Sequence, residues 1–187
     1  AQNTNRYILT EGEGRRIEQL RSYLKKLPSL LQKVIDTHGD LNVLSLVGWQ
    51  VLFGNDLDEE DHQLLLHILD KISTVTDAIL FTDAGGIETL NKIEKRRLWD
   101  VYSSFDLLSL NEDEIFQIAE TLNIEGSDEL EIMVELLTRS ETLSTIWLHT
   151  PNFQMTLSES LERKWIENSQ RISTFAGVYK VETGEFP

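Results

Sequence analysis

The sequence contains no cysteine. Disulfides, thiolate nucleophiles, zinc–cysteine sites and iron–sulfur clusters are therefore excluded. Proline and glycine are also scarce, with three and ten among 187 residues, so most of the chain is expected to form regular secondary structure. No apolar stretch approaches the roughly 20 residues that a membrane-spanning helix needs.

Positive charge is scarce as well. The chain has 17 lysines and arginines against 32 aspartates and glutamates, a formal net charge of −15. This balance argues against a nucleic-acid partner and against an anionic membrane surface, both of which require cationic protein surfaces. The ordinary explanation of such a charge is solubility. The compartment does not follow from composition; the cytoplasm is the default expectation.

With 40% hydrophobic residues, the chain is long enough for one ordinary core and too short for two comfortable domains, so residues 1–187 are expected to form a single domain. Helical apolar spacing alternates with short runs that are apolar on both faces. The spacing predicts helices over Arg15–Asp36, Asp58–Val75, Ile87–Tyr102, Glu112–Leu122, Asp128–Thr138 and Ser158–Tyr179. The short runs predict strands over Leu41–Val47, Ala78–Phe81, Phe105–Leu110 and Thr145–Leu148.

The alternation of strands and helices predicts an α/β fold, a three-layer α-β-α domain with a mostly parallel central sheet. Connections between successive parallel strands should be right-handed. A final apolar run, Phe153–Leu157, is expected to pair with the preceding strand as a hairpin across Pro151 and Asn152. Pro28 is expected to kink or divide the first helix.

Polar residues follow each predicted strand. Gln50 comes after the first strand, Asp83 after the second, Asn111 and Glu114 after the third, and His149 after the fourth. Ligands bind outside the carboxyl ends of the strands in open parallel sheets. The sequence therefore predicts a functional rim at this edge.

Each group at the rim also has a structural interpretation. Asn111 and Glu114 have the spacing of a helix capping box, and the alternative is that Glu112 or Glu114 helps to hold a hydrated Mg²⁺ beside a phosphate. The turn that begins at Asp83 is either a plain strand-to-helix connection or a backbone cradle for phosphate, although it lacks the Gly-Lys-Ser/Thr of a P-loop. His149 is as well suited to a structural hydrogen bond as to catalysis.

Several common motifs are missing. The sequence has no Gly-x-Ser-x-Gly nucleophile elbow and no dinucleotide-binding glycine fingerprint. His62 and His67 are five residues apart, which does not fit the HExxH zinc motif.

Four segments, in order along the chain, resemble the ADP-dependent sugar kinases, the ribokinase-like family of ADP-dependent glucokinase and phosphofructokinase. Asn-Arg-Tyr-Ile resembles the family's Asn-Arg-Phe-Ile, and a strand ending in Gly-Trp-Gln resembles its Leu-Ser-Gly-Leu-Gln/His turn. Asp-Leu-Leu-Ser-Leu-Asn-Glu-Asp-Glu-Ile resembles Ser-x-Gly-Leu-Asn-Glu-x-Glu-Leu, and Ile-Trp-Leu-His-Thr resembles Ile-His-x-His-Thr. These segments are residues 5–8, 44–50, 106–115 and 146–150.

The resemblance implies ADP as phosphoryl donor, Mg²⁺ as cofactor, and a hexose such as glucose, or fructose 6-phosphate, as acceptor. It places a first group of residues near the nucleotide and its phosphates: Arg6, Asp83, Asn111, His149 and Thr150. It places a second group near the metal ion: Asp83, Glu112 and Glu114.

The sequence departs from the family in two respects. The family's His-x-Glu at the second strand end is replaced by Phe81-Thr82-Asp83, and its Gly-x-Gly-Asp motif, which carries the catalytic base, is absent from these residues. No catalytic residue is therefore assigned, and this chain alone is expected not to turn over substrate. Two alternatives stay open: the central part of a longer kinase large domain, or a degenerate, non-catalytic binding or scaffold domain.

Overall fold

The computed structural model describes residues 15–53 and 58–171. Residues 1–14, which include Arg6, lie outside the described part, as does the end of the last predicted helix. The strands are β1 (Val43–Ser45), β2 (Ile79–Asp83), β3 (Leu107–Leu110), β4 (Thr145–His149) and β5 (Gln154–Ser158). The helices are α1 (Arg15–His38), α2 (Trp49–Phe53), α3 (Glu59–Val75), the 3-10 helix η1 (Ile87–Thr89), α4 (Lys92–Tyr102), α5 (Glu112–Leu122) and α6 (Glu129–Thr138), and residues 163–171 are also helical.

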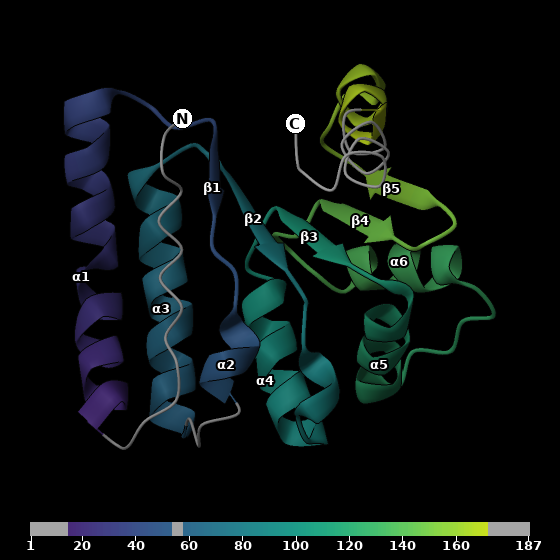
Figure 1. The fold of residues 1–187 in the computed structure, drawn as a ribbon, viewed down its shortest axis with the longest axis horizontal. Helices are drawn as coiled ribbons and strands as arrows, with labels where there is room; N and C mark the ends of the chain where they lie inside the picture. Colours follow the sequence, from purple (N-terminus) through teal and green to yellow (C-terminus); the bar gives the residue numbers. More distant parts are fainter. Residues whose placement is uncertain (1–14, 54–57, 172–187) are drawn as a thin grey trace, which may run out of the picture.

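The five strands form one sheet in the order β1-β2-β3-β4-β5 (Figure 1). The first four strands are parallel, and β5 pairs antiparallel with β4. The predicted α/β class, the mostly parallel sheet and the final hairpin are thereby confirmed. No helix in the described part is long and apolar enough to cross a membrane.

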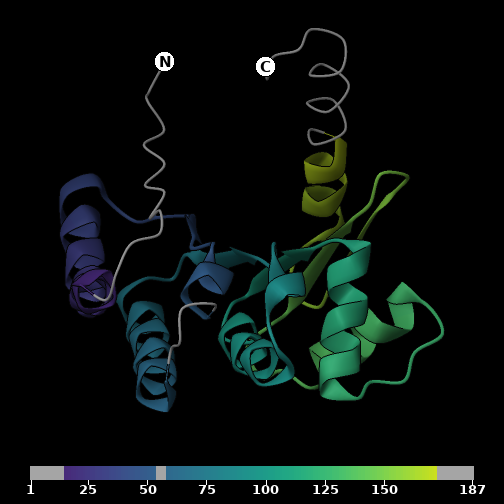
Figure 2. The ribbon, with the colours of Figure 1, turned by 60° about the horizontal axis from the view of Figure 1, so that its bottom comes forward.

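Helices lie on both sides of this sheet. Successive strands are neighbours, so right-handed crossovers place all the connecting helices on the same face, and Figure 2 shows α3, α4, α5 and α6 together there. The helical residues 163–171 lie on the other side, where Gln170 Nε2 donates to Thr156 Oγ1 at 3.1 Å. The arrangement is consistent with part of a three-layer ribokinase-like domain, although the crossover helices themselves cover only one face.

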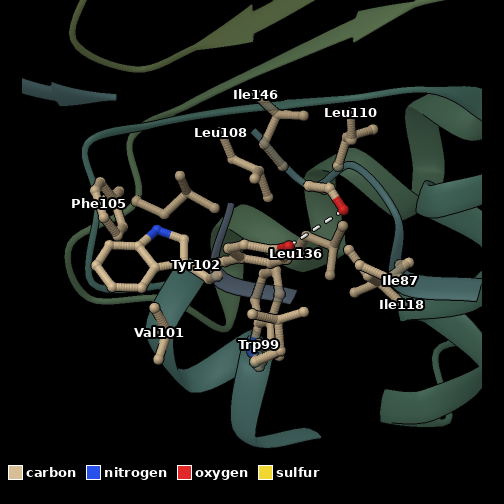
Figure 3. Close-up of a cluster of buried hydrophobic side chains, with 14 of the residues drawn as sticks. Ile87, Trp99, Val101, Tyr102, Phe105, Leu108, Leu110, Ile118, Leu136 and Ile146 are labelled. Atoms are coloured by element: carbon tan, nitrogen blue, oxygen red, sulfur yellow. Dashed lines mark hydrogen bonds between the residues drawn. The ribbon is translucent and has the colours of Figure 1, made fainter. Parts of the chain in front are cut away.

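The core lies between the sheet and the crossover helices. Leu108, Leu110 and Ile146 from the strands are fully buried, and they pack with Tyr102 at the end of α4 and Phe105 just after it (Figure 3). The burial of these apolar side chains is the main source of the fold's stability.

The structure corrects three details of the predicted elements. The predicted helix Ile87–Tyr102 is divided, because Asn91 begins a new helix with a capping box that it shares with Glu94. The short helix α2 was not predicted, because its segment has no clear helical spacing of apolar residues. Helix α1 continues through Pro28 and is not divided there.

Candidate functional site

The predicted rim is formed by the ends of three neighbouring strands. Asp83, the last residue of β2, lies beside Ser109 of β3, and Ser109 lies beside Trp147 of β4. His149 ends β4, and Asn111 immediately follows β3. Because β2, β3 and β4 run in the same direction, their polar end residues come to one edge of the sheet.

Glu114 belongs both to a helix cap and to this rim. Its Oε2 accepts the backbone N–H of Asn111 at 2.8 Å, and Asn111 Oδ1 accepts the backbone N–H of Glu114 at 3.0 Å. These two bonds form the capping box at the start of α5. The capping interpretation is therefore confirmed, and a further hydrogen bond from the backbone of Gly86 ties Glu114 to the turn after β2.

Electrostatics connect Glu114 to its neighbours at the rim. Glu114 is only 5% exposed. Burial and the charge of Asp83 raise its pKa, whereas the backbone hydrogen bonds from Asn111 and Gly86 and the charge of His149 act in the opposite direction. The pKa of Glu114 is raised overall, so burial together with the neighbouring Asp83 carboxylate outweighs these stabilising interactions.

Two glycines let these carboxylates approach the turn. Gly86 has φ +81°, a backbone conformation that residues other than glycine rarely adopt. A Cβ on Gly85 would stand 3.2 Å from Asp83 Oδ2 and 4.0 Å from Glu114 Oε1. The bare backbone of Gly85 therefore keeps open the space that both carboxylates border.

Gln50 covers the same turn from α2. A Cβ on Gly86 would meet Gln50 Cγ at 3.1 Å, so the two residues are in close contact. The Oε1 atom of Gln50 is buried and accepts no hydrogen bond within the described residues. The sequence placed Gln50 near the rim but assigned no role to it; a buried amide oxygen without a donor is a signal that only coordinates reveal.

His149 is held in place by Ser109 and Trp147. Its Nδ1 lies 3.3 Å from Ser109 Oγ, and its ring meets the ring of Trp147 edge-on, with centroids 6.3 Å apart. Ser109, which stands inside a short apolar strand, had no predicted role. Ser109 and His149 alternate with the core residues Leu108, Leu110 and Leu148 along their strands, so they extend the rim onto the sheet face opposite the crossover helices.

Thr150, which was expected near the nucleotide, has a structural role. Its Oγ1 accepts the backbone N–H groups of Asn152 and Phe153 and donates to the carbonyl of Phe153. These bonds stabilise the turn between β4 and β5, which directly follows His149.

Two buried aromatic residues support the end of β2. Trp49 Nε1 donates to the Leu46 carbonyl at 3.0 Å and to Thr82 Oγ1 at 3.1 Å. The Tyr102 hydroxyl donates to the Ala84 carbonyl at 3.2 Å (Figure 3). Burial and the charges of Glu114 and Asp83 raise the pKa of Tyr102 far above its ordinary value, so it remains a neutral donor.

The expected metal ligands do not all converge. Within the described part of the chain, no group of three acidic, histidine or cysteine side chains is arranged to hold a metal ion. Asp83 and Glu114 interact electrostatically, but no described contact joins Glu112, at the first turn of α5, to either of them. A pair of carboxylates nevertheless suits Mg²⁺, which binds through one or two carboxylates plus water and substrate phosphates.

No protein-family model matches the chain, and no curated protein matches it in sequence. Among solved structures, its fold matches the last common ancestor of ADP-dependent phosphofructokinases from Methanosarcinales, with a TM-score of 0.52 and 17% sequence identity. The chain therefore resembles part of the fold of that protein.

The match covers 68% of this chain and 28% of the phosphofructokinase ancestor. The chain therefore spans less than a third of that protein's length. At 17% identity the relationship concerns the fold alone.

Proposed function

We propose that these residues form a nucleotide-binding part of an ADP-dependent sugar kinase, which transfers a phosphoryl group from ADP to a hexose or a hexose phosphate. The Asp83–Glu114 carboxylate pair at the strand ends, set on a kinase-like fold, is the observation that carries the proposal.

In this proposal, Asp83 and Glu114 hold Mg²⁺ together with water and nucleotide phosphate. The bound ion would neutralise charge on the phosphates during transfer. Glu114 is fixed by its backbone hydrogen bonds before any ligand arrives, so its carboxylate is already positioned.

The remaining rim groups suit the recognition of a polar ligand. The buried Oε1 of Gln50 is an acceptor for a ligand hydroxyl or amino group. His149, held by Ser109, can donate to a phosphate oxygen from its other ring nitrogen. The chain as printed contains no Gly-x-Gly-Asp, so binding without turnover is the activity expected of it.

Calorimetric titration with ADP, AMP and ATP, each with and without Mg²⁺, tests the proposal. We expect Mg²⁺-dependent heats for nucleotide that are lost in Asp83→Asn and Glu114→Gln. Glu112→Gln, in the same helical turn as Glu114, is the matched control and should bind like wild type. The absence of heat for every nucleotide at millimolar concentration would contradict the proposal.

A non-catalytic binding or scaffold domain is the second candidate. It is favoured by Phe81-Thr82-Asp83 at the place where the resembled family has His-x-Glu, and by the missing Gly-x-Gly-Asp. The longest native chain that contains these residues discriminates the two candidates. Phosphorylation of glucose or fructose 6-phosphate by that chain supports the kinase, and nucleotide binding without phosphorylation supports the second candidate.

A further inference from the structure

The hydroxyl of Tyr102 reaches the backbone of the rim from inside the core. Tyr102 is the last residue of α4 and is only 1% exposed. Its hydroxyl donates to the Ala84 carbonyl at 3.2 Å, and Figure 3 shows this bond among the buried side chains of the core. A phenylalanine ring would fill the same space, so the hydroxyl contributes this hydrogen bond and no additional packing.

Ala84 joins the end of β2 to the glycines of the turn. Ala84 is fully buried and directly follows Asp83, the last residue of β2. Its N–H donates to the Ser109 carbonyl at 2.9 Å, so both backbone groups of Ala84 are held, the N–H by β3 and the carbonyl by α4. The next residue is Gly85, whose bare backbone keeps open the space that Asp83 and Glu114 border.

The bond from Tyr102 also sets the direction of one backbone N–H group. The Ala84 carbonyl and the Gly85 N–H belong to the same peptide unit, and in a trans peptide these two groups point in opposite directions. No peptide bond of residues 15–53 or 58–171 is cis. The Gly85 N–H therefore points away from the Tyr102 hydroxyl, and it donates to no acceptor among the described residues.

The two glycines make the turn dependent on such bonds. Gly85 and Gly86 have more backbone freedom than other residues, so the peptide between Ala84 and Gly85 could rotate if its carbonyl were not held. Gly86 donates its N–H to the Glu114 carboxylate. A rearranged turn would therefore displace groups that contact Glu114 as well as the backbone next to Asp83.

We propose that Tyr102 is a positioning residue for the rim. By holding the Ala84 carbonyl, its hydroxyl fixes the turn that carries Asp83 and Gly86. The same bond directs the Gly85 N–H away from the core, as a hydrogen-bond donor to a phosphate oxygen of the bound nucleotide. Backbone N–H groups at glycine suit phosphate, because no side chain blocks its approach. The phosphate contact rests on the proposed function, whereas the fixing of the turn does not.

Calorimetric titration of the full chain tests the role of the hydroxyl. Tyr102→Phe should raise the Kd for ADP with Mg²⁺ by about 3- to 10-fold, the range expected when one hydrogen bond is lost. Thr145→Val is the matched control, because it removes a buried hydroxyl that pairs with Ser158 Oγ at 2.7 Å and lies at the amino end of β4, away from the rim. Thr145→Val should bind like wild type; equal weakening in both variants, or none in Tyr102→Phe, would overturn the proposal.

Amide hydrogen exchange of the nucleotide-free protein tests the turn by itself. The Gly86 amide, which donates to Glu114, should exchange faster in Tyr102→Phe than in wild type. The Leu46 amide, which bonds to Phe81 of β2, should exchange equally in both proteins. Unchanged exchange of the Gly86 amide would show that the hydroxyl only satisfies the core, and it would overturn the positioning role.

The Gly85 amide proton gives a readout in wild type that needs no substitution. On addition of ADP with Mg²⁺ its NMR resonance should move downfield, because a phosphate oxygen then accepts this N–H. Binding heat without a shift of the Gly85 resonance would overturn the assignment of this donor. If wild type shows neither heat nor shift, the proposed function fails together with the phosphate contact, and the exchange of the Gly86 amide alone decides the positioning role.

Discussion

Glu114 takes part in two arrangements through a single carboxylate. Oε2 completes the capping box with Asn111, and burial beside Asp83 raises the pKa of the group. A helix cap alone does not require this burial, since the second capping box, of Asn91 and Glu94, is made at an exposed helix end. The burial of Glu114 beside Asp83 is therefore not explained by its role in the helix cap.

The raised pKa of Glu114 predicts a pH-dependent contribution to stability. A folded-state pKa above the unfolded value, about 4.3 for glutamate, stabilises the folded state below that value, and the contribution is lost as pH rises through the folded pKa. The unfolding free energy of wild type relative to Glu114→Gln should therefore fall as pH rises from about 4 toward 7. Urea unfolding of both proteins across this range measures the difference, with Glu112→Gln as control; a difference that grows with pH would contradict the assignment.

The Trp49 indole predicts a measurable coupling with Thr82. Trp49→Phe removes the donor to Leu46 and Thr82 and leaves buried oxygens unsatisfied, at a cost of about 1–3 kcal/mol. In a Thr82→Val background one of those oxygens is already absent. Trp49→Phe should therefore lower the unfolding free energy by about 1 kcal/mol less in Thr82→Val than in wild type. Denaturant unfolding of the four proteins in this cycle tests the coupling, and strictly additive effects would refute it.

At the scale of elements, capping residues decide where helices begin. Asp58, Asn91, Asn111 and Asp128 each accept a backbone N–H in the first turn of the helix that follows. Three of these four starts agree closely with the predicted boundaries. The start at Asn91 was missed because the apolar spacing of residues 87–102 continues across it, although Asn91 and Glu94 have the sequence spacing of a capping box.

The two capping boxes form a matched pair for experiment. Asn91→Ala and Asn111→Ala should each lower the unfolding free energy by about 1 kcal/mol, because both remove an N-cap acceptor. Only Asn111→Ala disturbs Glu114, so only this variant should weaken the binding of ADP with Mg²⁺ in calorimetry. Equal weakening in both variants would indicate a general loss of stability instead of a local effect.

At the scale of the whole molecule, the sheet order determines the shape of the rim. Each parallel strand lies beside the next one in the chain, so within the described residues the order does not reverse and no topological switch point is formed. The rim is therefore an open edge whose polar groups come from adjoining strands. A net charge of −15 over the chain adds to the negative potential there.

This charge predicts two separable effects of salt on thermal stability. NaCl between about 10 and 200 mM should raise Tm, since it screens self-repulsion over distances that shrink from about 30 Å to below 10 Å. At equal ionic strength, MgCl₂ should raise Tm further in wild type but not in Asp83→Asn or Glu114→Gln. Differential scanning fluorimetry measures both effects; an equal additional shift in the variants would show that Mg²⁺ acts elsewhere.

The sequence by itself determined most of the elements and their class. Residues 107–110 and 145–149 are strands because short runs apolar on both faces bury well in a parallel sheet, and α5 begins where Asn111 and Glu114 have capping-box spacing. The gathering of Asp83, Glu114 and His149 followed from the parallel direction of their strands. These features depend on local spacing and chain direction, which a sequence records.

Only the tertiary structure decided how those residues interact. The contact of Gln50 with Gly86 and the pairing of Ser109 with His149 across 40 residues both depend on how elements pack. So does the structural use of Thr150 in the hairpin turn. Packing brings together atoms that are distant along the chain, and the burial that shifts the pKa of Glu114 exists only once the core has formed around it.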